Sequence, residues 1–153
     1  MSQFTFRHLD VWKQGMGLVE QIYRSTQPFP RSEQYGITNQ IRRATLSIPC
    51  NIAEGHCRRS TKAFMNHVSI ALGSHGELET LLEVSCRLGF LGPDEHRRLS
   101  TLAATVGRLL NGLYNSLERT ASGGERVDRQ AKSHGSDQVS VGGPSGQRGS
   151  TSP

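Results

Sequence analysis

The sequence predicts an all-α protein: an antiparallel up-down four-helix bundle with a disordered C-terminal tail. Apolar residues recur every three or four positions through most of the chain, whereas the alternation typical of a strand never lasts long enough to define one. Short segments rich in proline, glycine or serine divide this periodic region into four stretches. Because short connections favour antiparallel neighbours, we expect one bundle domain over residues 1–120.

The first helix is expected from Leu9 or Asp10 to about Thr26. The segment QPFPRS, with Pro28 and Pro30, should end it. Its large apolar residues stand four, three and four positions apart, and we expect them to form its buried stripe: Trp12, Met16, Val19 and Tyr23.

The second helix is expected from about Arg31 to Cys57 and contains Pro49. A proline in a helix interior costs about 3 kcal/mol, so its presence needs a reason. We interpret Pro49 as a kink that bends this helix around its neighbours and frees the carbonyl of Thr45. The expected buried stripe is Ile37, Ile41, Ala44, Ile48 and Ile52.

Two further faces of the second helix carry the functional hypotheses. Beside the buried stripe, at spacings that allow side chains to hydrogen-bond, we expect a structural polar network of Arg43, Ser47, Asn51 and Glu54. Nearly opposite the core lies a strip that is too apolar for a purely solvated surface, and it suits contact with another subunit. Its members are Arg42, Leu46, Cys50, Ala53 and Cys57.

The third helix should begin after Ser60, a good N-cap, and the fourth at Pro93, which fits a first helical turn. Gly89 is the expected cap between them. The expected stripe of the third helix is Phe64, Val68, Ala71, His75, Leu78 and Leu82. That of the fourth is Leu99, Leu102, Val106, Leu109, Leu113 and Leu117.

Residues 121–153 are expected to be a disordered tail rich in glycine and serine. From Ser122 onward the only large apolar residues are three valines, too few to offset the entropy lost on ordering.

The charge pattern suggests a polyanionic partner. The net charge is +5, and residues 31–62 hold six basic residues but only two acidic ones. Guanidinium groups bind phosphate without reading bases, so we expect nucleic acid to bind here with little sequence preference. The candidate nucleic-acid-binding residues are Arg42, Arg43, Arg58, Arg59 and Lys62.

Other chemistry finds little support in the sequence. Three cysteines without a C-x-x-C pair argue against a disulfide framework or a zinc site and favour reduced thiols in a cytoplasmic protein. His75, Glu79 and Glu83 share a helix face, but no Glu-x-x-His pair accompanies them, so we expect no metal and no cofactor. Adjacent His56 and Cys57 point about 100 degrees apart on a helix and cannot pair as a nucleophile and base. No catalytic residue is therefore expected, and neither export nor membrane spanning.

Several segments carry a family resemblance. They are FRHLDVWKQGMGLVEQIY, FPRSEQYGITNQIRRATLSIPCNIAEG, STKAFMNHVSIALGSHGELETLL and LGFL. In this order they resemble the bacterial four-helix-bundle proteins encoded in intervening sequences of 23S ribosomal RNA genes. That family is similar in turn to the accessory variability proteins of diversity-generating retroelements. The resemblance covers residues 4–118 and leaves out the tail.

The resemblance implies a bundle that assembles into a ring, commonly of five subunits, with a basic surface. It also implies contact with nucleic acid and, for the accessory proteins, with a reverse transcriptase. It implies no catalytic residue.

Two other function classes stay open. One is an oligomeric adaptor whose ligand is a protein. The other is a helical-bundle ribonuclease of the HEPN kind, marked on a bundle helix by an arginine, four to six intervening residues and then a histidine. Here only Arg129 and His134 have that spacing, and they fall in the expected tail.

Overall fold

The computed structural model describes residues 5–134, and their side chains through residue 123. Within that range the chain forms four α-helices: α1 (Asp10–Ser25), α2 (Ile37–Cys57), α3 (Thr61–Arg87) and α4 (Pro93–His134). Short 3-10 helices, Phe6–His8 and Arg31–Glu33, precede α1 and α2. No strand occurs among these residues, so the all-α prediction is confirmed.

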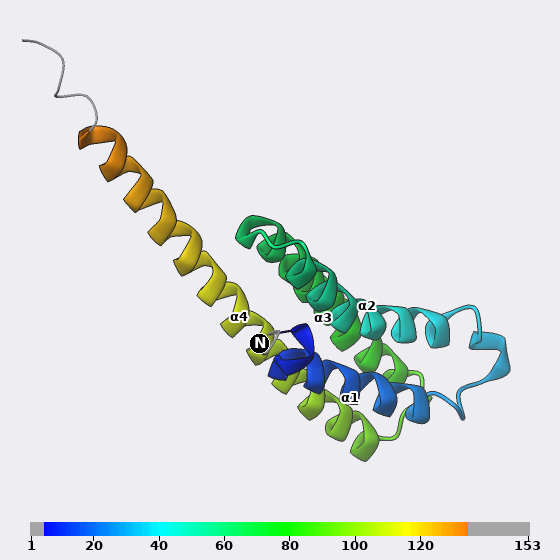
Figure 1. Ribbon diagram of the computed structural model, residues 1–153. Helices are drawn as coiled ribbons and strands as arrows, with labels where there is room; N and C mark the ends of the chain where they lie inside the picture. Colours follow the sequence, from blue (N-terminus) through cyan, green and yellow to red (C-terminus); the bar gives the residue numbers. More distant parts are fainter. Residues whose placement is uncertain (1–4, 135–153) are drawn as a thin grey trace, which may run out of the picture. The chain divides into compact units, whose positions relative to one another are not determined.

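The chain divides into two units, residues 1–121 and 122–153, and the first unit contains the bundle. There α1 and α3 run in one direction, and α2 and the first part of α4 run in the other (Figure 1). The predicted up-down four-helix arrangement is confirmed. Helix α4 continues past the expected start of the tail as far as His134, so the backbone of residues 122–134 is helical rather than irregular. The rest of the expected tail lies outside the described residues.

One buried cluster from all four helices holds the first unit together. On α2 and α3 the buried residues include Ile41, Ile48, Ile52, Val68 and Leu78, as the spacing predicted. At about 1.5–3 kcal/mol for each large side chain buried, this cluster is the main source of stability. Helix α4 contributes Leu99, Ala103, Val106 and Leu110.

The predicted stripe of α1 is wrong by one position. Val11, Leu18 and Ile22 are buried, while Met16 and Tyr23 are each 38% exposed. Both sets of residues have the same spacing and lie about 100 degrees apart around the helix. Periodicity fixes the spacing of a stripe, but it does not decide which of two adjacent stripes faces the core.

Helix α2 begins later than predicted. Its first residue is Ile37 rather than one near Arg31, because a turn at residues 34–36 separates it from the 3-10 helix. Glu33 accounts for this start, since its Oε2 accepts a hydrogen bond from the backbone N–H of Ile37 at 3.1 Å. A side-chain acceptor of this kind satisfies one of the free N–H groups at a helix start.

The predicted signals at both ends of α3 and at the start of α4 are confirmed. Ser60 Oγ accepts from the N–H of Ala63 at 3.3 Å and caps α3. Gly89 has φ = 77°, a left-handed conformation that glycine adopts at little cost, and it ends α3. Pro93 is the first residue of α4, and Asp94 and Glu95 follow in its first turn.

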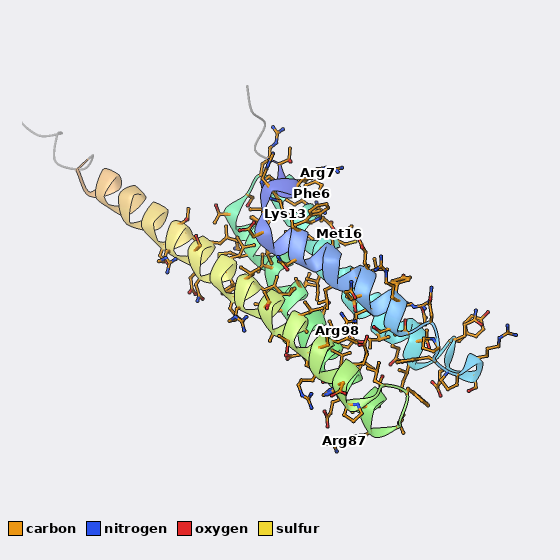
Figure 2. All side chains as sticks on the ribbon, turned by 90° about the horizontal axis from the view of Figure 1, so that it is seen from below. Phe6, Arg7, Lys13, Met16, Arg87 and Arg98 are labelled. Carbon is orange, nitrogen blue, oxygen red and sulfur yellow. The ribbon has the colours of Figure 1, made fainter. Side chains whose placement is uncertain are left out.

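Helix α4 is tied to α1 by polar contacts as well as by the core. Glu95 accepts hydrogen bonds from Ser25 of α1 and from Arg98 of its own helix. Arg98 also reaches Gln21 of α1 at 3.0 Å, and Figure 2 shows Arg98 on the side of α4 that faces α1. The hydrogen bond from Arg98, followed by that from Ser25, lowers the pKa of Glu95 to about 2.

Candidate nucleic-acid interface

Pro49 is buried in the middle of α2 without ending the helix. Helix α1 crosses it at Gly15, where a Cβ atom would lie 3.6 Å from Pro49 Cβ. The ring is thus covered by apolar neighbours, and the burial offsets part of the cost of the missing hydrogen bond.

A polar seam joins α2 to α3. Asn51 Nδ2 donates to Ser47 Oγ at 3.0 Å and to the Ser47 carbonyl at 2.8 Å, while Ser47 Oγ lies 2.7 Å from Ser74 Oγ. Asn51 Oδ1 lies 3.0 Å from His67 Nδ1. These side chains are half-buried, so the hydrogen bonds between them replace the hydrogen bonds to water that they lose when the helices pack. We call Ser47, Asn51, His67 and Ser74 the seam.

The predicted polar network is therefore partly correct. Ser47 and Asn51 are bonded as expected, and Glu54 lies at the edge, with Oε1 3.8 Å from His67 Nε2. Arg43 lies outside it, because within the described part of the chain it makes no hydrogen bond or ion pair. Nothing in the amino-acid pattern indicated Ser74 and His67 as partners, since their alignment with α2 depends on how the two helices cross.

A close helix approach fixes the seam. At Gly55 of α2, a Cβ atom would lie 2.7 Å from His67 Cβ and 2.8 Å from Phe64 Cδ2. Carbon atoms in contact normally stand about 3.5–4.0 Å apart. Glycine at this position therefore allows α2 and α3 to approach closely enough for the seam to form.

Two of the five candidate cations are engaged in the fold. Arg42 Nε donates to Thr26 Oγ1 at 2.9 Å, and its guanidinium stands 4.6 Å from the centre of the Tyr23 ring. Arg58 donates to Glu54 Oε1 at 2.8 Å. This bond, together with the charge of His67, lowers the pKa of Glu54.

The other three candidates, Arg43, Arg59 and Lys62, are exposed and make no hydrogen bond or ion pair with the residues whose side chains are described. Arg59 and Lys62 stand at the corner between α2 and α3, where Arg59 takes a left-handed backbone conformation with φ = 54°. Arg43 lies fourteen residues before Cys57, where α2 ends, which corresponds to about 21 Å along the helix, and Arg59 and Lys62 lie beyond that end. The free cations thus form two separate groups rather than one patch.

Arg43 borders two hollows at the start of α2. The first, of about 400 Å³, lies between α2 and α3 and is lined by Tyr35, Asn39, Gln40, Arg43, Ala44, Ser47, Ser74 and Glu77. The second, of about 360 Å³, lies toward α1 and is lined by Tyr23, Gln34, Tyr35, Thr38, Asn39, Arg42 and Arg43. We call the first the Arg43 groove. Tyr35, which sequence reasoning missed, borders both hollows and is 87% exposed.

The outer strip of α2 is exposed along much of its length. Cys50 and Cys57 are exposed free thiols, Leu46 is 36% exposed, and Ala53 is half-buried. Arg42 belongs to this strip by sequence but is held against α1.

His75 has a structural role in the packing of α3 against α4. His75 is buried, its Nε2 donates to the Ala103 carbonyl at 2.7 Å, and its ring covers Gly107. No cluster of His, Cys, Asp or Glu suited to a metal ion occurs among the described residues. Arg129 and His134 lie in the last part of α4, where side chains are not described. In residues 5–134 no helix is both long and apolar enough to cross a membrane.

Comparison with known proteins agrees with the four-helix fold. A family model described as "23S rRNA-intervening sequence protein" matches residues 7–112. A solved structure from Bacteroides thetaiotaomicron, a protein of unknown function from the S23 ribosomal protein family, has a similar fold with a TM-score of 0.62. Its sequence identity is 22%, and the alignment covers 68% of this chain and 97% of that one. No curated protein matches.

Proposed function

Because the chain belongs to the 23S rRNA-intervening sequence protein family, we propose that it is a non-enzymatic, self-associating bundle that binds RNA or DNA. Binding uses a basic surface and shows little sequence preference. The observation that carries this proposal is that Arg43, Arg59 and Lys62 remain exposed and unpartnered within the described side chains. Free cations of this kind bind phosphates and release counterions.

The corner between α2 and α3 supports the same conclusion. A non-glycine residue in the left-handed region costs about 1 kcal/mol, which glycine would avoid. Arg59 adopts this strained conformation, which places its guanidinium at an exposed corner three residues before Lys62. A phosphate bound by the Arg59 guanidinium would offset this conformational cost.

Self-association is the second part of the proposal. The outer strip of α2 presents Leu46, Cys50 and Cys57 to the surface, and burying it between copies removes apolar area from water. The resemblance to retroelement accessory proteins supports a ring of about five copies and a reverse transcriptase as a partner. The exposed thiols fit a reducing, cytoplasmic setting.

A salt titration tests the nucleic-acid part. Duplex RNA labelled at one end is titrated with the full chain at several salt concentrations, and log K should fall by about 0.9 per phosphate neutralised for each decade of salt. The triple variant R43Q/R59Q/K62Q should bind weakly at every concentration and show a flatter slope. Arg97→Gln is the matched control, because Arg97 is already paired with Asp94 at 2.9 Å.

Binding that does not depend on salt, or a triple variant that binds like the wild type, would contradict the proposal. With a salt-independent result, the oligomeric adaptor becomes the better interpretation. Light scattering on the full chain tests self-association, and Leu46→Lys should shift the measured mass toward a monomer. A wild-type monomer at micromolar concentration would remove the ring from the proposal.

A further inference from the structure

Tyr35 is exposed in a manner unusual for an aromatic residue. Its side chain is 87% exposed, the largest value among the exposed large hydrophobic residues of the described part. It lies in the short turn that Glu33 fixes by bonding to the N–H of Ile37. The backbone that carries the ring is therefore anchored, while the ring itself borders two hollows and is open to a ligand.

The groups around this ring are those that recognise a nucleotide. Arg43 borders the same two hollows and has no partner among the described side chains, so its guanidinium is available to a phosphate. Asn39 also borders both hollows, and Gln40 borders the Arg43 groove. Their amides can donate to and accept from the edge of a base.

A buried polar group without a partner among the described residues borders the hollow on the other side of Tyr35, next to the Arg43 groove. Thr38 is 7% exposed, and its hydroxyl oxygen is the one buried side-chain polar atom without a hydrogen-bond partner in the described part. It borders the hollow on the α1 side of Tyr35. A buried hydroxyl without a partner costs about 1–3 kcal/mol, which water or a ligand group in that hollow can recover.

We infer that Tyr35 and Arg43 hold one nucleotide of a single strand, with its base stacked on the Tyr35 ring and its phosphate bound by Arg43. This inference rests on the proposed nucleic-acid binding and adds a site for an unpaired base. Stacking suits such a site because every base has an aromatic face, so it adds affinity without sequence preference.

Glu77 sets the orientation of the nucleotide. It stands on α3, on the other wall of the Arg43 groove, and a carboxylate repels a phosphate. The phosphate therefore lies on the α2 side, near Arg43, and the base edge points toward α3. There the carboxylate can accept hydrogen bonds from ring N–H or amino groups of the base.

The test compares two labelled 12-nucleotide RNA strands with equal numbers of phosphates, one intact and one with abasic positions in its central half. Fluorescence anisotropy measures their affinity for the full chain. The wild type should bind the intact strand about ten-fold more tightly, the scale of stacking one base on an aromatic side chain. Tyr35→Ala should remove this difference, and Tyr35→Phe should keep it.

Arg43→Gln should weaken binding of both strands and lower the salt slope by about one. Two surface controls should bind both strands like the wild type: Leu88→Ala, which removes another exposed apolar side chain, and Arg108→Gln, which removes a distant exposed charge.

The outcomes separate this site from the proposed function. If the wild type binds both strands equally and binding depends on salt, the nucleotide site is overturned and the proposed function stands. The site is also overturned if Tyr35→Ala keeps the preference for the intact strand. If the wild type binds neither these strands nor duplex RNA at low salt, both inferences are overturned.

Discussion

Gly55→Ala provides the sharpest test of the packing that holds the seam. The added methyl carbon would lie 2.7 Å from His67 Cβ, about 1 Å inside the normal contact distance. His67 Cβ is attached directly to the α3 backbone, so rotating a side chain cannot relieve the clash. The two helices must separate locally.

The magnitude follows from three contributions. Overpacking of this kind costs about 1–3 kcal/mol, and loosening the bond between Asn51 and His67 adds about 1 kcal/mol. Replacing glycine by alanine within a helix returns about 1 kcal/mol. We therefore expect the free energy of unfolding to fall by about 1–3 kcal/mol.

Urea denaturation followed by circular dichroism measures this change, at one fixed protein concentration because self-association alters apparent stability. Gly73→Ala is the matched control, since it is also within a helix but a Cβ there meets nothing within 4 Å. It should stabilise the protein by up to about 1 kcal/mol. If Gly55→Ala is as stable as Gly73→Ala, the helices are not held at the described distance and the reasoning fails.

Two further predictions concern polar contacts. Asn51→Ala should lower the free energy of unfolding by about 1–3 kcal/mol, because Ser47 and His67 lose a half-buried partner. Glu54→Ala should leave the free energy of unfolding near that of the wild type, because Glu54 is exposed. Equal effects of the two substitutions in urea denaturation would contradict this assignment. The folded-state pKa of Glu95, about 2, lies below its unfolded value, so its stabilising contribution is complete above the unfolded pKa and is lost as the pH falls toward 2. Glu95→Gln should therefore flatten the decline in stability between about pH 5 and 2, and parallel curves for the two proteins would refute the role of Glu95.

The sequence predicted the fold well because every helix has a periodic apolar stripe and recognisable ends. Ser60, Gly89 and Pro93 act locally, so their roles can be read without knowing the tertiary structure. The stripe of α1 is not the predicted one. Trp12 and Met16 are larger than Val11 and Gly15, so the apolar pattern favours the face that carries them, although the other face is buried. Which face is buried depends on the neighbouring helix, here on the fit of Gly15 against Pro49.

The candidate site was only partly predictable for a related reason. Ser47 and Asn51 are one turn apart on one helix, so their bond follows from helical geometry. Asn51 also contacts His67 on α3, and Arg42 contacts Thr26 just after α1; each of these partners is sixteen residues away in sequence, and periodicity carries no information about them. The same holds for Tyr35, since its position beside Arg43 depends on how the turn before α2 is capped.

The length of α2 determines how far apart its two groups of cations lie, and its close contacts hold the helix in place. Helix α1 meets α2 at Gly15 and Pro49, and α3 meets it at Gly55, so α2 is held from two sides. Arg43 and the end of α2 at Cys57 are about 21 Å apart along the helix, which corresponds to about six phosphates at about 3.4 Å per nucleotide of one strand. A strand of twelve nucleotides is long enough to place a base on Tyr35 and still reach the corner. Stacking therefore reports on the Tyr35 end alone, whereas salt dependence reports on the cations at both ends, which is why the abasic strand and the charge variants can separate the two contributions.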